Sequence, residues 1–595
     1  MSTRQANAPI QVINDWPGSV DRGERKVPTI LIYNYNGSLS TWGFMCEDDD
    51  DRAHMGKTRR EFFKIFLDQE TLDAAHQHGL TQAPKNTGEA QVLVTEYLRQ
   101  IYTHVKETIE TQLGLRMRGG WSQLAVEFVF SVPTTWTNLS IINTFKSIIC
   151  DAGFGSEGLR HNAVIDLTEA EAAAVATVKQ SAIMWQPGEI FLSIDAGGGT
   201  TDLALMQITN ADASFPQMNQ ISAVKGVGIG ASLIDRAFIA LVARRLAAVP
   251  DIQSQLPPDF PQRMSRSHQF KTTKHKFGER AYTQEVYRIP MEGVSHEFTH
   301  PGIGVENARM AFSHQEIQSI FDPQIEGVIQ RVQEQLDWMK DQGLTQQVQY
   351  MVLSGGLGSS AYVRDMLQNR FSTFPHPNAQ RVQILPCTDP QLVVIRGLLL
   401  DRQQALDTGS MSVLAARVAR ASYGVVVQEV YSPTVHFNED IRPDAYEPAK
   451  RFAINQIQWL IRKGDVINPN APLVKSFEIR VGQNEGTRAW DSEIVVSHNE
   501  PNFLPRSLKQ AGAVKLCDIK SNLSGVQQHQ LALMHKKGTC FSRGYTFYIC
   551  QFEVRVIVAP ADLRFELWFG GQRFAGNHEP IAVAWDQNGA ATRPG

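Results

Sequence analysis

The feature that most constrains this chain is a glycine-rich segment between two apolar stretches, Ile190-Phe-Leu-Ser-Ile-Asp-Ala-Gly-Gly-Gly-Thr-Thr-Asp-Leu-Ala-Leu-Met206. This order predicts a β-hairpin whose turn holds phosphate, because glycines let backbone N–H groups approach an anion closely and Thr200 and Thr201 add hydroxyl donors. Asp195 and Asp202 fall at the strand ends, where carboxylates can hold hydrated Mg²⁺. The alternative is a glycine turn without a ligand, but the full order is more specific than three glycines alone.

Length and composition indicate a soluble protein of two to four domains, with 595 residues, 42% hydrophobic and 20% charged. A net charge of −4, from 57 basic and 61 acidic side chains, does not favour nucleic acid or an anionic membrane as a partner. The six cysteines lie far apart, which favours buried reduced thiols over a zinc site. The polar first nine residues and the lack of an apolar run of about 18 residues predict a cytoplasmic location.

The first third of the chain reads as alternating strands and helices, typical of an α/β region. A largely apolar strand, Ala125–Pro133, is of the kind that is buried on both faces of a parallel sheet. The other elements that we expect here are strands at 10–13, 29–33 and 163–166, mostly helix over 59–113, and helices at 137–152 and 168–176.

The glycine hairpin opens a second α/β region. Gly226–Gly230 leads into a helix at 231–246, and a proline-rich loop follows at 249–261. After a long amphipathic helix at 314–342, a strand at 349–353 runs into a second glycine turn, Ser354-Gly-Gly-Leu-Gly-Ser-Ser360. A strand, a glycine turn and a helix in this order suit a phosphate or a nucleoside. From residue 412 onward, alternating apolar positions predict a mostly β region.

Taken together, these motifs resemble the ATPase superfamily of actin, sugar kinases and the 70-kDa heat-shock chaperones, and within it the atypical, family-12-like members common in fungi. The resemblance rests on five segments in the family's order: Phe130–Trp136, Thr168–Ala174, Ile194–Asp202, Leu353–Ser360 and Asp389–Gly397. It implies a two-lobed, actin-like/ribonuclease H-like ATPase fold. Lobe I would span residues 1–187, lobe II with the returning helix 188–404, and a β-rich partner-binding region 412–595.

The resemblance also implies a site for ATP or ADP with Mg²⁺. Asp195 and Asp202 would order the metal through water, and Glu169 would orient the attacking water, so these three are the candidate catalytic residues. The candidate nucleotide-binding residues are Gly197, Gly198, Gly199, Thr200, Thr201, Gly228, Gly230, Lys274, Gly355 and Gly356. The alternative is a packing role only, since Ala-rich and Gly-rich turns also serve close helix contacts.

Two differences from the family bear on catalysis. The family's first phosphate hairpin, Asp-x-Gly-Thr-Thr, has no counterpart, and Ile10-Gln-Val-Ile-Asn-Asp15 already resembles the third strand of lobe I. The family's catalytic lysine, expected near Thr41-Trp-Gly-Phe-Met-Cys46, has no evident counterpart either. An incomplete N-terminal sequence explains the first difference, and a degenerate ATPase explains both.

The expected function is that of a chaperone-like protein in which ATP hydrolysis is coupled to the binding of an unfolded or extended polypeptide or a protein partner. An exposed strand edge or groove near Tyr423–Val427 would capture the partner. One alternative is a nucleotide-binding scaffold without turnover; a sugar kinase is less well supported. The β-rich region could also be a structural cap that buries its own edges.

Overall fold

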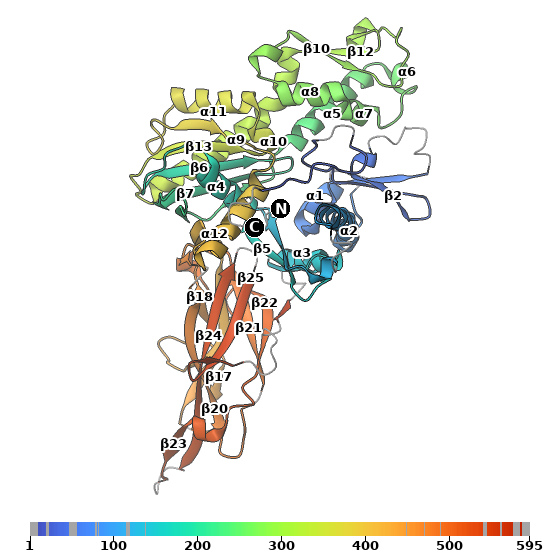
Figure 1. The fold of residues 1–595 in the computed structure, drawn as a ribbon. Coiled ribbons are helices and arrows are strands. Elements are labelled where there is room, and N and C mark those ends of the chain that lie inside the picture. Colours follow the sequence, from blue (N-terminus) through green and yellow to red (C-terminus); the bar gives the residue numbers. More distant parts are fainter. Residues whose placement is uncertain are drawn as a thin grey trace.

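The computed structural model describes residues 10–19, 23–46, 56–77, 80, 83–114, 120–136, 139–447, 449–468, 471–487, 489–538, 544–559, 562–574 and 583–585. Figure 1 shows an α/β body from which a long β-rich arm extends. The polar start at residues 1–9 and the first two residues of the helix expected at 137–152 lie outside the described residues. A mixed α/β chain with several sheets and a β-rich C-terminal region is thus confirmed.

The N-terminal α/β region, residues 10–187, contains two separate small sheets. One is antiparallel, in the order β2-β1-β3; the other is the parallel pair β4-β5. Helices α2 and α3 pack together beside them. The elements are β1 (Ile30–Tyr33), β2 (Leu39–Trp42), β3 (Thr58–Glu61), the 3-10 helix η3 (Phe63–Leu67), α1 (Gln69–Gln77), α2 (Thr87–Gln112), β4 (Val126–Val132), α3 (Leu139–Asp151), β5 (His161–Thr168) and α4 (Glu169–Gln180).

Two expectations for this region were wrong. Residues 10–13 form no strand, because a strand needs a pairing partner and no described strand lies beside them. The stretch 59–113 is mostly helical as expected, with η3, α1 and α2, although β3 extends to residue 61. Strand β4 is not buried on both faces: six of its seven residues are only half-buried. In the described part of the chain, β4 pairs with β5 alone, so its other edge is open.

The central α/β region, residues 188–411, is built on an eight-stranded sheet that also takes in β15 and β19 from later in the chain. The strand order is β14-β13-β6-β7-β8-β15-β19, with β9 beside β7. Strand β6 alternates between two cores: Ile190, Leu192 and Ile194 face the long helix α9, and Phe191 faces α4. The strands are β6 (Ile190–Ala196), β7 (Thr201–Asn210), β8 (Gln217–Gln220), β9 (Lys225–Val227), β13 (Val348–Ser354), β14 (Gln383–Pro386), β15 (Leu414–Val418) and β19 (Val466–Ile467).

Helices cover both faces of this sheet (Figure 1). The helices are α5 (Ala231–Ala247), α6 (Pro250–Gln253), α7 (Phe260–Arg266), α8 (His268–Lys276), α9 (His314–Asp341), α10 (Gly355–Gly358), α11 (Ala361–Thr373) and α12 (Val393–Thr408). The proline-rich stretch 249–261 is therefore not simply a loop, because its Pro250 starts the short helix α6. Beside α7 and α8 lies a small sheet of β10 (Val286–Pro290), β12 (Arg309–Ser313) and β11 (Val305–Glu306).

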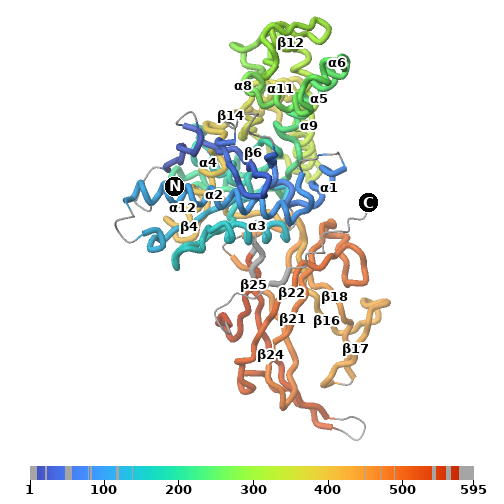
Figure 2. Tube along the Cα trace, turned by 90° about the vertical axis from the view of Figure 1, so that its right-hand side faces the viewer, coloured from blue at the N-terminus to red at the C-terminus, as the bar shows by residue number. Residues whose placement is uncertain are grey.

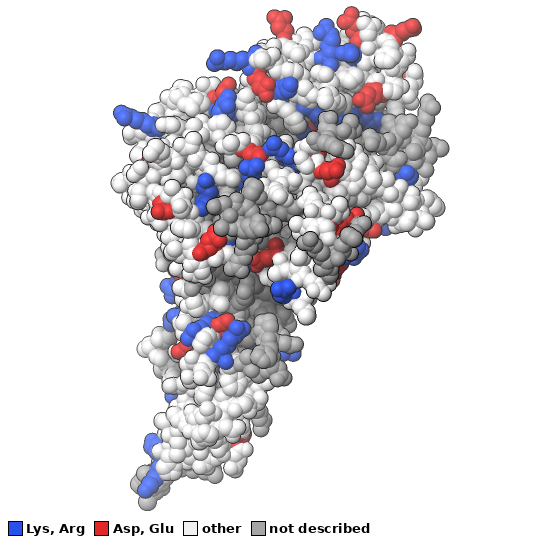
Figure 3. Space-filling view, in the orientation of Figure 1, with Lys and Arg blue, Asp and Glu red and all other residues white. Residues whose placement is uncertain are grey.

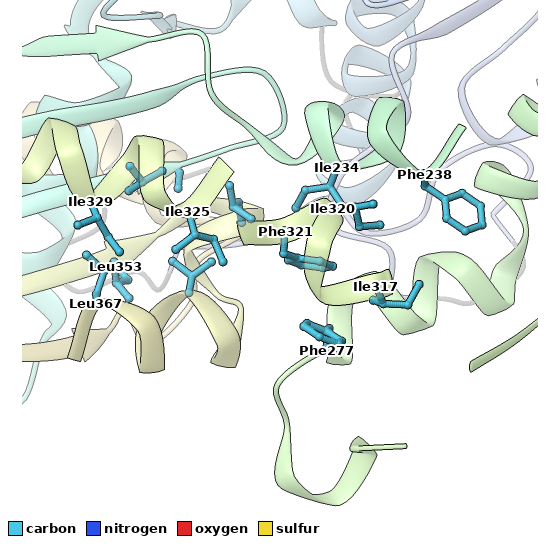
Figure 4. Close-up of a cluster of buried hydrophobic side chains, with 14 of the residues drawn as sticks. Ile234, Phe238, Phe277, Ile317, Ile320, Phe321, Ile325, Ile329, Leu353 and Leu367 are labelled. Atoms are coloured by element: carbon cyan, nitrogen blue, oxygen red, sulfur yellow. The ribbon is translucent and has the colours of Figure 1, made fainter. Parts of the chain in front are cut away.

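On one face of the sheet, buried apolar side chains of α5, α9 and α11 pack against those of the strands (Figure 4). Ile317, Ile320 and Phe321 of α9 contribute to one stripe, as expected for an amphipathic helix. Phe277 stacks on Phe321 with ring centroids 4.8 Å apart. This buried apolar layer fixes α5 and α9 against the sheet whose opposite face carries the candidate site.

In the β-rich region two sheets pack face to face. Figure 2 shows β24 on one side of the arm and β16 and β18 on the other. One sheet runs β17-β18-β16-β21-β22-β27, and the other β20-β24-β25-β26 with β23 beside β24. The strands are β16 (Ser422–Val430), β17 (Ile441–Pro443), β18 (Arg451–Ile461), β20 (Leu473–Gly482), β21 (Trp490–Ser497), β22 (Val514–Ser521), β23 (Ala532–Lys536), β24 (Tyr545–Ala559), β25 (Asp562–Phe569), β26 (Gln572–Arg573) and β27 (Val583–Trp585).

The exposed edge expected near Tyr423–Val427 is absent at Tyr423–Val425, which pair on both sides, whereas Val426 and Val427 pair with β18 alone among the described strands. β16 is an inner strand: Tyr423 pairs with both β18 and β21 and is buried. Of the cysteines, Cys150 is exposed, contrary to the expectation of buried thiols. Among the described helices, none combines the length and the apolar character needed to cross a membrane. Basic and acidic side chains are interspersed over the face of the α/β body shown in Figure 3.

Candidate functional site

The two aspartates of the glycine hairpin lie directly opposite each other. β6 and β7 pair antiparallel with Asp195 opposite Asp202, and directly opposed residues share one face of a sheet. By the alternation of β6, that face is the one toward α4. Asp195 is 7% exposed and Asp202 1% exposed. The hairpin therefore directs two buried carboxylates toward the start of α4, where Glu169 is the first helical residue.

The turn between the aspartates is closed by its own backbone and by α5. The Gly197 N–H donates to the Thr200 carbonyl at 2.8 Å, and the Gly198 carbonyl accepts from the Ser232 N–H at 2.8 Å. Gly198 and Gly199 are exposed, and a Cβ added to either would meet no atom within 4 Å. The N-terminus of α5 thus contacts one side of the turn, and the other side faces open space. This arrangement suits an anion.

Two other predicted glycines are needed for close packing around the turn. A Cβ on Gly230 would lie 2.6 Å from the carbonyl oxygen of Gly198. A Cβ on Gly355, whose φ is +80°, would lie 2.4 Å from the Ala196 carbonyl oxygen and 2.7 Å from an Asp195 carboxylate oxygen. Gly228 and Gly356 have no such neighbour within 4 Å and border open space.

The threonines of the turn have different roles. The Thr200 hydroxyl donates to Asp202 Oδ2 at 2.9 Å, so Thr200 does lie at the site. Thr201 is fully buried, and its hydroxyl donates to the Ile229 carbonyl at 2.7 Å. Thr201 therefore ties β7 to the segment before α5, and its hydroxyl is not directed at a phosphate.

Burial and mutual repulsion make both aspartates unusually basic. Burial, with the nearby Glu169 carboxylate, raises the pKa of Asp195 to about 6 and that of Asp202 to about 8. Ser354 Oγ donates to Asp195 Oδ1 at 3.0 Å, while Asp202 Oδ1 has no hydrogen-bond partner among the described residues. Three carboxylates gathered around an open turn favour a divalent cation.

Glu169 is held in place by a capping box and by a lysine. The Thr168 hydroxyl accepts from the Glu171 N–H, and the Glu171 carboxylate accepts from the Thr168 N–H, which fixes the first turn of α4. Lys64 Nζ, from η3, lies 3.1 Å from Glu169 Oε1 and 5.6 Å from the centre of the Trp136 ring. The site therefore has a lysine, which lies outside the stretch 41–46 where the resemblance would place one and where this chain has none.

The sequence does not mark Lys64 as a site residue, because its partner Glu169 lies 105 residues further along the chain. Its signal is a lone lysine between Phe63 and Phe66, both of which are buried. A second missed segment precedes β1. Arg25 Nη1 donates to both Asp389 carboxylate oxygens at 3.0 Å, and the neighbouring Lys26 ammonium offsets part of the rise in the pKa of Asp195.

The resemblance would place Lys274 along the adenine and ribose of the nucleotide, away from the glycine turn. It lies on α8, and its Nζ is 2.7 Å from Asp235 Oδ1 on the second turn of α5. The structure thus brings together Asp195, Asp202, Glu169, the glycine turn, Gly230 and Gly355, and leaves Lys274 beside α5.

The donor set fits Mg²⁺ held through water. No group of three or more histidine, cysteine or acidic side chains in the described part of the chain is arranged to bind a metal ion directly. Mg²⁺ usually keeps several of its waters, and the unpartnered Asp202 Oδ1 offers one acceptor for them.

Comparison with known proteins bears on the β-rich arm alone. Residues 417–587 match a family described as a domain of unknown function, DUF8568. This match begins within β15 and takes in the rest of the β-rich region. A search of curated proteins found no match to the chain.

Proposed function

We propose that this chain is a two-lobed, actin-like ATPase that binds ATP or ADP with Mg²⁺ between its N-terminal and central α/β regions. The observation that carries the proposal is the glycine turn between Asp195 and Asp202. It faces open space, it is held from behind by α5, and Gly230 and Gly355 let neighbouring segments approach it closely. The proposed fold, ligand and activity are those that the resemblance to the actin-like ATPase superfamily implies.

The arrangement around the turn supports slow hydrolysis. Mg²⁺, when bound, would neutralise the β- and γ-phosphates. Asp195 and Asp202 would accept hydrogen bonds from its waters, and Glu169 would orient the attacking water. Lys64 supplies positive charge from the N-terminal region, where charge stabilisation of the transferring phosphoryl group is needed.

We also propose that nucleotide binding is coupled to a polypeptide partner on the β-rich arm. Strand β15 joins the central sheet beside β8, and the Val418 N–H donates to Gln220 Oε1 at 2.9 Å. Gln220 in turn donates to Glu171, two residues from Glu169. The edge that suits an extended partner is β20, ten residues long, which pairs in the described chain with β24 alone.

Calorimetric titration with Mg-ADP tests the nucleotide site. The full chain should bind one Mg-ADP, and Asp195→Asn should weaken binding about tenfold or more, because it removes a carboxylate that orders metal-bound water. Asp251→Asn, an exposed aspartate at the start of α6, is the matched control and should bind as the wild type does. Equal affinities for all three proteins would contradict the site.

Phosphate release separates the ATPase from a scaffold without turnover. We expect release above background that Glu169→Gln abolishes, while Mg-ADP binding by the variant persists. Binding without measurable release by the wild type would favour the scaffold.

A labelled apolar peptide tests the coupling to a partner. The full chain should bind the peptide with an affinity that differs between Mg-ATP and Mg-ADP. A copy with alternate backbone nitrogens methylated should bind poorly, because addition to an edge strand depends on main-chain hydrogen bonds. Equal binding of both peptides would contradict capture at β20.

A further inference from the structure

A pocket of about 470 Å³ lies at the β14 edge of the central sheet, on the face that carries α4. Met351 and Ile384 belong to the core on the α9 side, so their neighbours Tyr350, Val352 and Leu385 face the other way and line the pocket. The end of α4 and the start of α12 form its sides. The pocket is thus the place where these two helices leave the apolar face of β13 and β14 uncovered.

The lining of this pocket carries no unpaired charge. Asp389 is the one charged residue among those that line it, and its carboxylate accepts from Arg25 Nη1 at 3.0 Å and lies 3.2 Å from Arg396 Nη2. Burial raises the pKa of the Cys387 thiol, which therefore stays protonated at neutral pH. An ion that entered would lose hydration without gaining a counter-charge, so the pocket favours an uncharged ligand.

One polar group in the wall lacks a partner. Ser181 follows the last residue of α4, and its N–H donates to the Thr177 carbonyl at 3.0 Å. Its hydroxyl oxygen is buried and has no hydrogen-bond partner among the described residues. The Thr177 hydroxyl, in contrast, already donates to the Ala173 carbonyl at 2.9 Å. A ligand with a hydrogen-bonding group would satisfy Ser181, since buried polar atoms are nearly always paired.

Met184 and Tyr350 favour an aromatic ring as the apolar part of the ligand. The Met184 side chain lines the pocket and is 86% exposed, and thioethers make favourable contacts with aromatic rings. Trp185 packs edge-on against the Tyr350 ring, with centroids 5.4 Å apart, and holds it in place. The volume lies within the range of about 300–1,000 Å³ that is typical of small-molecule sites.

The edge strand beside the pocket is poorly suited to an extended polypeptide. β14 has four residues, Gln383–Pro386, and its last residue is a proline. Proline has no N–H to donate to an added strand, and short edge strands with proline resist strand addition. A small molecule therefore fits the pocket better than a peptide does.

We propose that this pocket binds a small, uncharged aromatic compound of one or two rings that carries one hydrogen-bonding group. The rings lie against Met184, Tyr350 and Val352, and the hydrogen-bonding group meets the Ser181 hydroxyl. Neither aspartate of the glycine hairpin lines the pocket, so the proposal does not rest on nucleotide binding.

The test uses 2-naphthol as the probe and naphthalene-2-sulfonate as its charged counterpart. Ligand-observed NMR titrations of the full chain would give both affinities. 2-Naphthol should bind saturably, and the sulfonate should bind at least about tenfold more weakly, because the pocket offers it no counter-charge. Ser181→Ala should weaken 2-naphthol about three- to tenfold and leave naphthalene, which has no hydroxyl, unchanged.

A pocket-filling variant locates the probe. Ala182 lines the pocket and is exposed, so Ala182→Trp should fill the pocket without disturbing the core, and 2-naphthol affinity should fall at least about tenfold. Ala281→Trp, at another exposed alanine that does not line the pocket, is the matched control and should bind 2-naphthol as the wild type does.

Four results would overturn the proposal. These are no saturable binding of 2-naphthol, equal affinities for 2-naphthol and the sulfonate, binding that Ala182→Trp leaves intact, and an affinity for 2-naphthol that Ser181→Ala does not change. Each of them would leave the nucleotide site untouched, because the titrations contain no nucleotide.

Discussion

The central sheet and the β4-β5 pair differ in how completely their strands are paired. Every inner strand of the central sheet has partners on both sides, and β6 is buried along its whole length. β4 is equally apolar, yet it has one partner in the described chain and is mostly half-buried. An apolar strand sequence therefore predicts a strand, but burial depends on neighbours elsewhere in the chain.

The same difference shapes the candidate site. The central region contributes a paired hairpin with Asp195 and Asp202 on its strands and glycines in its turn. The N-terminal region contributes Lys64 from a 3-10 helix and Glu169 from a helix start. One side of the candidate site thus rests on a sheet, and the other on a 3-10 helix and the start of a helix beside the β4-β5 pair.

The contact that joins the two regions should be the most sensitive to change. A Cβ on Gly397 of α12 would lie 1.8 Å from the Ala172 carbonyl oxygen of α4. Gly397→Val should therefore lower the free energy of unfolding by at least about 4 kcal/mol, because backbone must move to relieve the overlap. Urea unfolding would measure it, with Gly486→Ala, which meets no atom within 4 Å, as the control. Equal unfolding midpoints would contradict this close approach.

Truncations on the two sheets should differ in size. Leu192→Ala on β6 removes a fully buried side chain and should cost about 3 kcal/mol, whereas Val129→Ala on half-buried β4 should cost about 1 kcal/mol. Unfolding of both variants in urea checks the ratio. Similar losses would mean that β4 is covered as completely as β6, and the contrast between the regions would fail.

Lys64 tests what the N-terminal region contributes to catalysis. Lys64→Met should reduce phosphate release about a hundredfold, because it removes a positive charge beside the proposed phosphate site, and should change Mg-ADP affinity little. Lys85→Met, an exposed lysine before α2, is the matched control. Unchanged release by the Lys64 variant would leave the central hairpin as the sole source of any activity.

The aspartates of the central hairpin should make binding depend on pH. With pKa values of about 6 for Asp195 and about 8 for Asp202, both carboxyls lose protons as pH rises toward 8, so Mg-ADP affinity should rise about tenfold from pH 6 to 8. Calorimetry in buffers of different ionisation enthalpy should detect proton release on binding, and Asp202→Asn should reduce it. Proton uptake on binding would contradict the assignment.

The raised pKa of Asp202 should also make the stability of the unliganded protein depend on pH. The pKa of Asp202 is raised on folding, so its favourable contribution is complete below the unfolded value of 3.8 and is lost as pH rises through about 8. Unliganded wild-type protein should therefore lose stability over this range relative to Asp202→Asn, as thermal unfolding at several pH values would show.

Local features of the chain predicted much of the candidate site. The hairpin, its opposed aspartates and the start of α4 at Glu169 follow from short motifs, because strand pairing across a tight turn and helix capping depend on residues close in sequence. The β-rich C-terminal region follows from alternation of apolar residues in the same way.

Features that depend on distant segments could not be predicted. The strand expected at 10–13 did not form because no described strand lies beside it. Tyr423 was expected at an edge, but β21, far along the chain, covers that side of β16. Lys64 meets Glu169 across more than a hundred residues, so no local pattern marks it as part of the site.

Hydrogen–deuterium exchange of the full chain with and without Mg-ADP tests the central claim most directly, because it locates the ligand. The account predicts protection in three peptides that meet at the glycine turn, covering residues 195–202, 228–233 and 354–358. A separate pocket of about 470 Å³, lined by Thr177, Tyr350 and Cys387 among others, lies between α4 and β14 and provides an internal comparison. Protection confined to the peptides that line this pocket, or none at the turn, would contradict nucleotide binding by the hairpin.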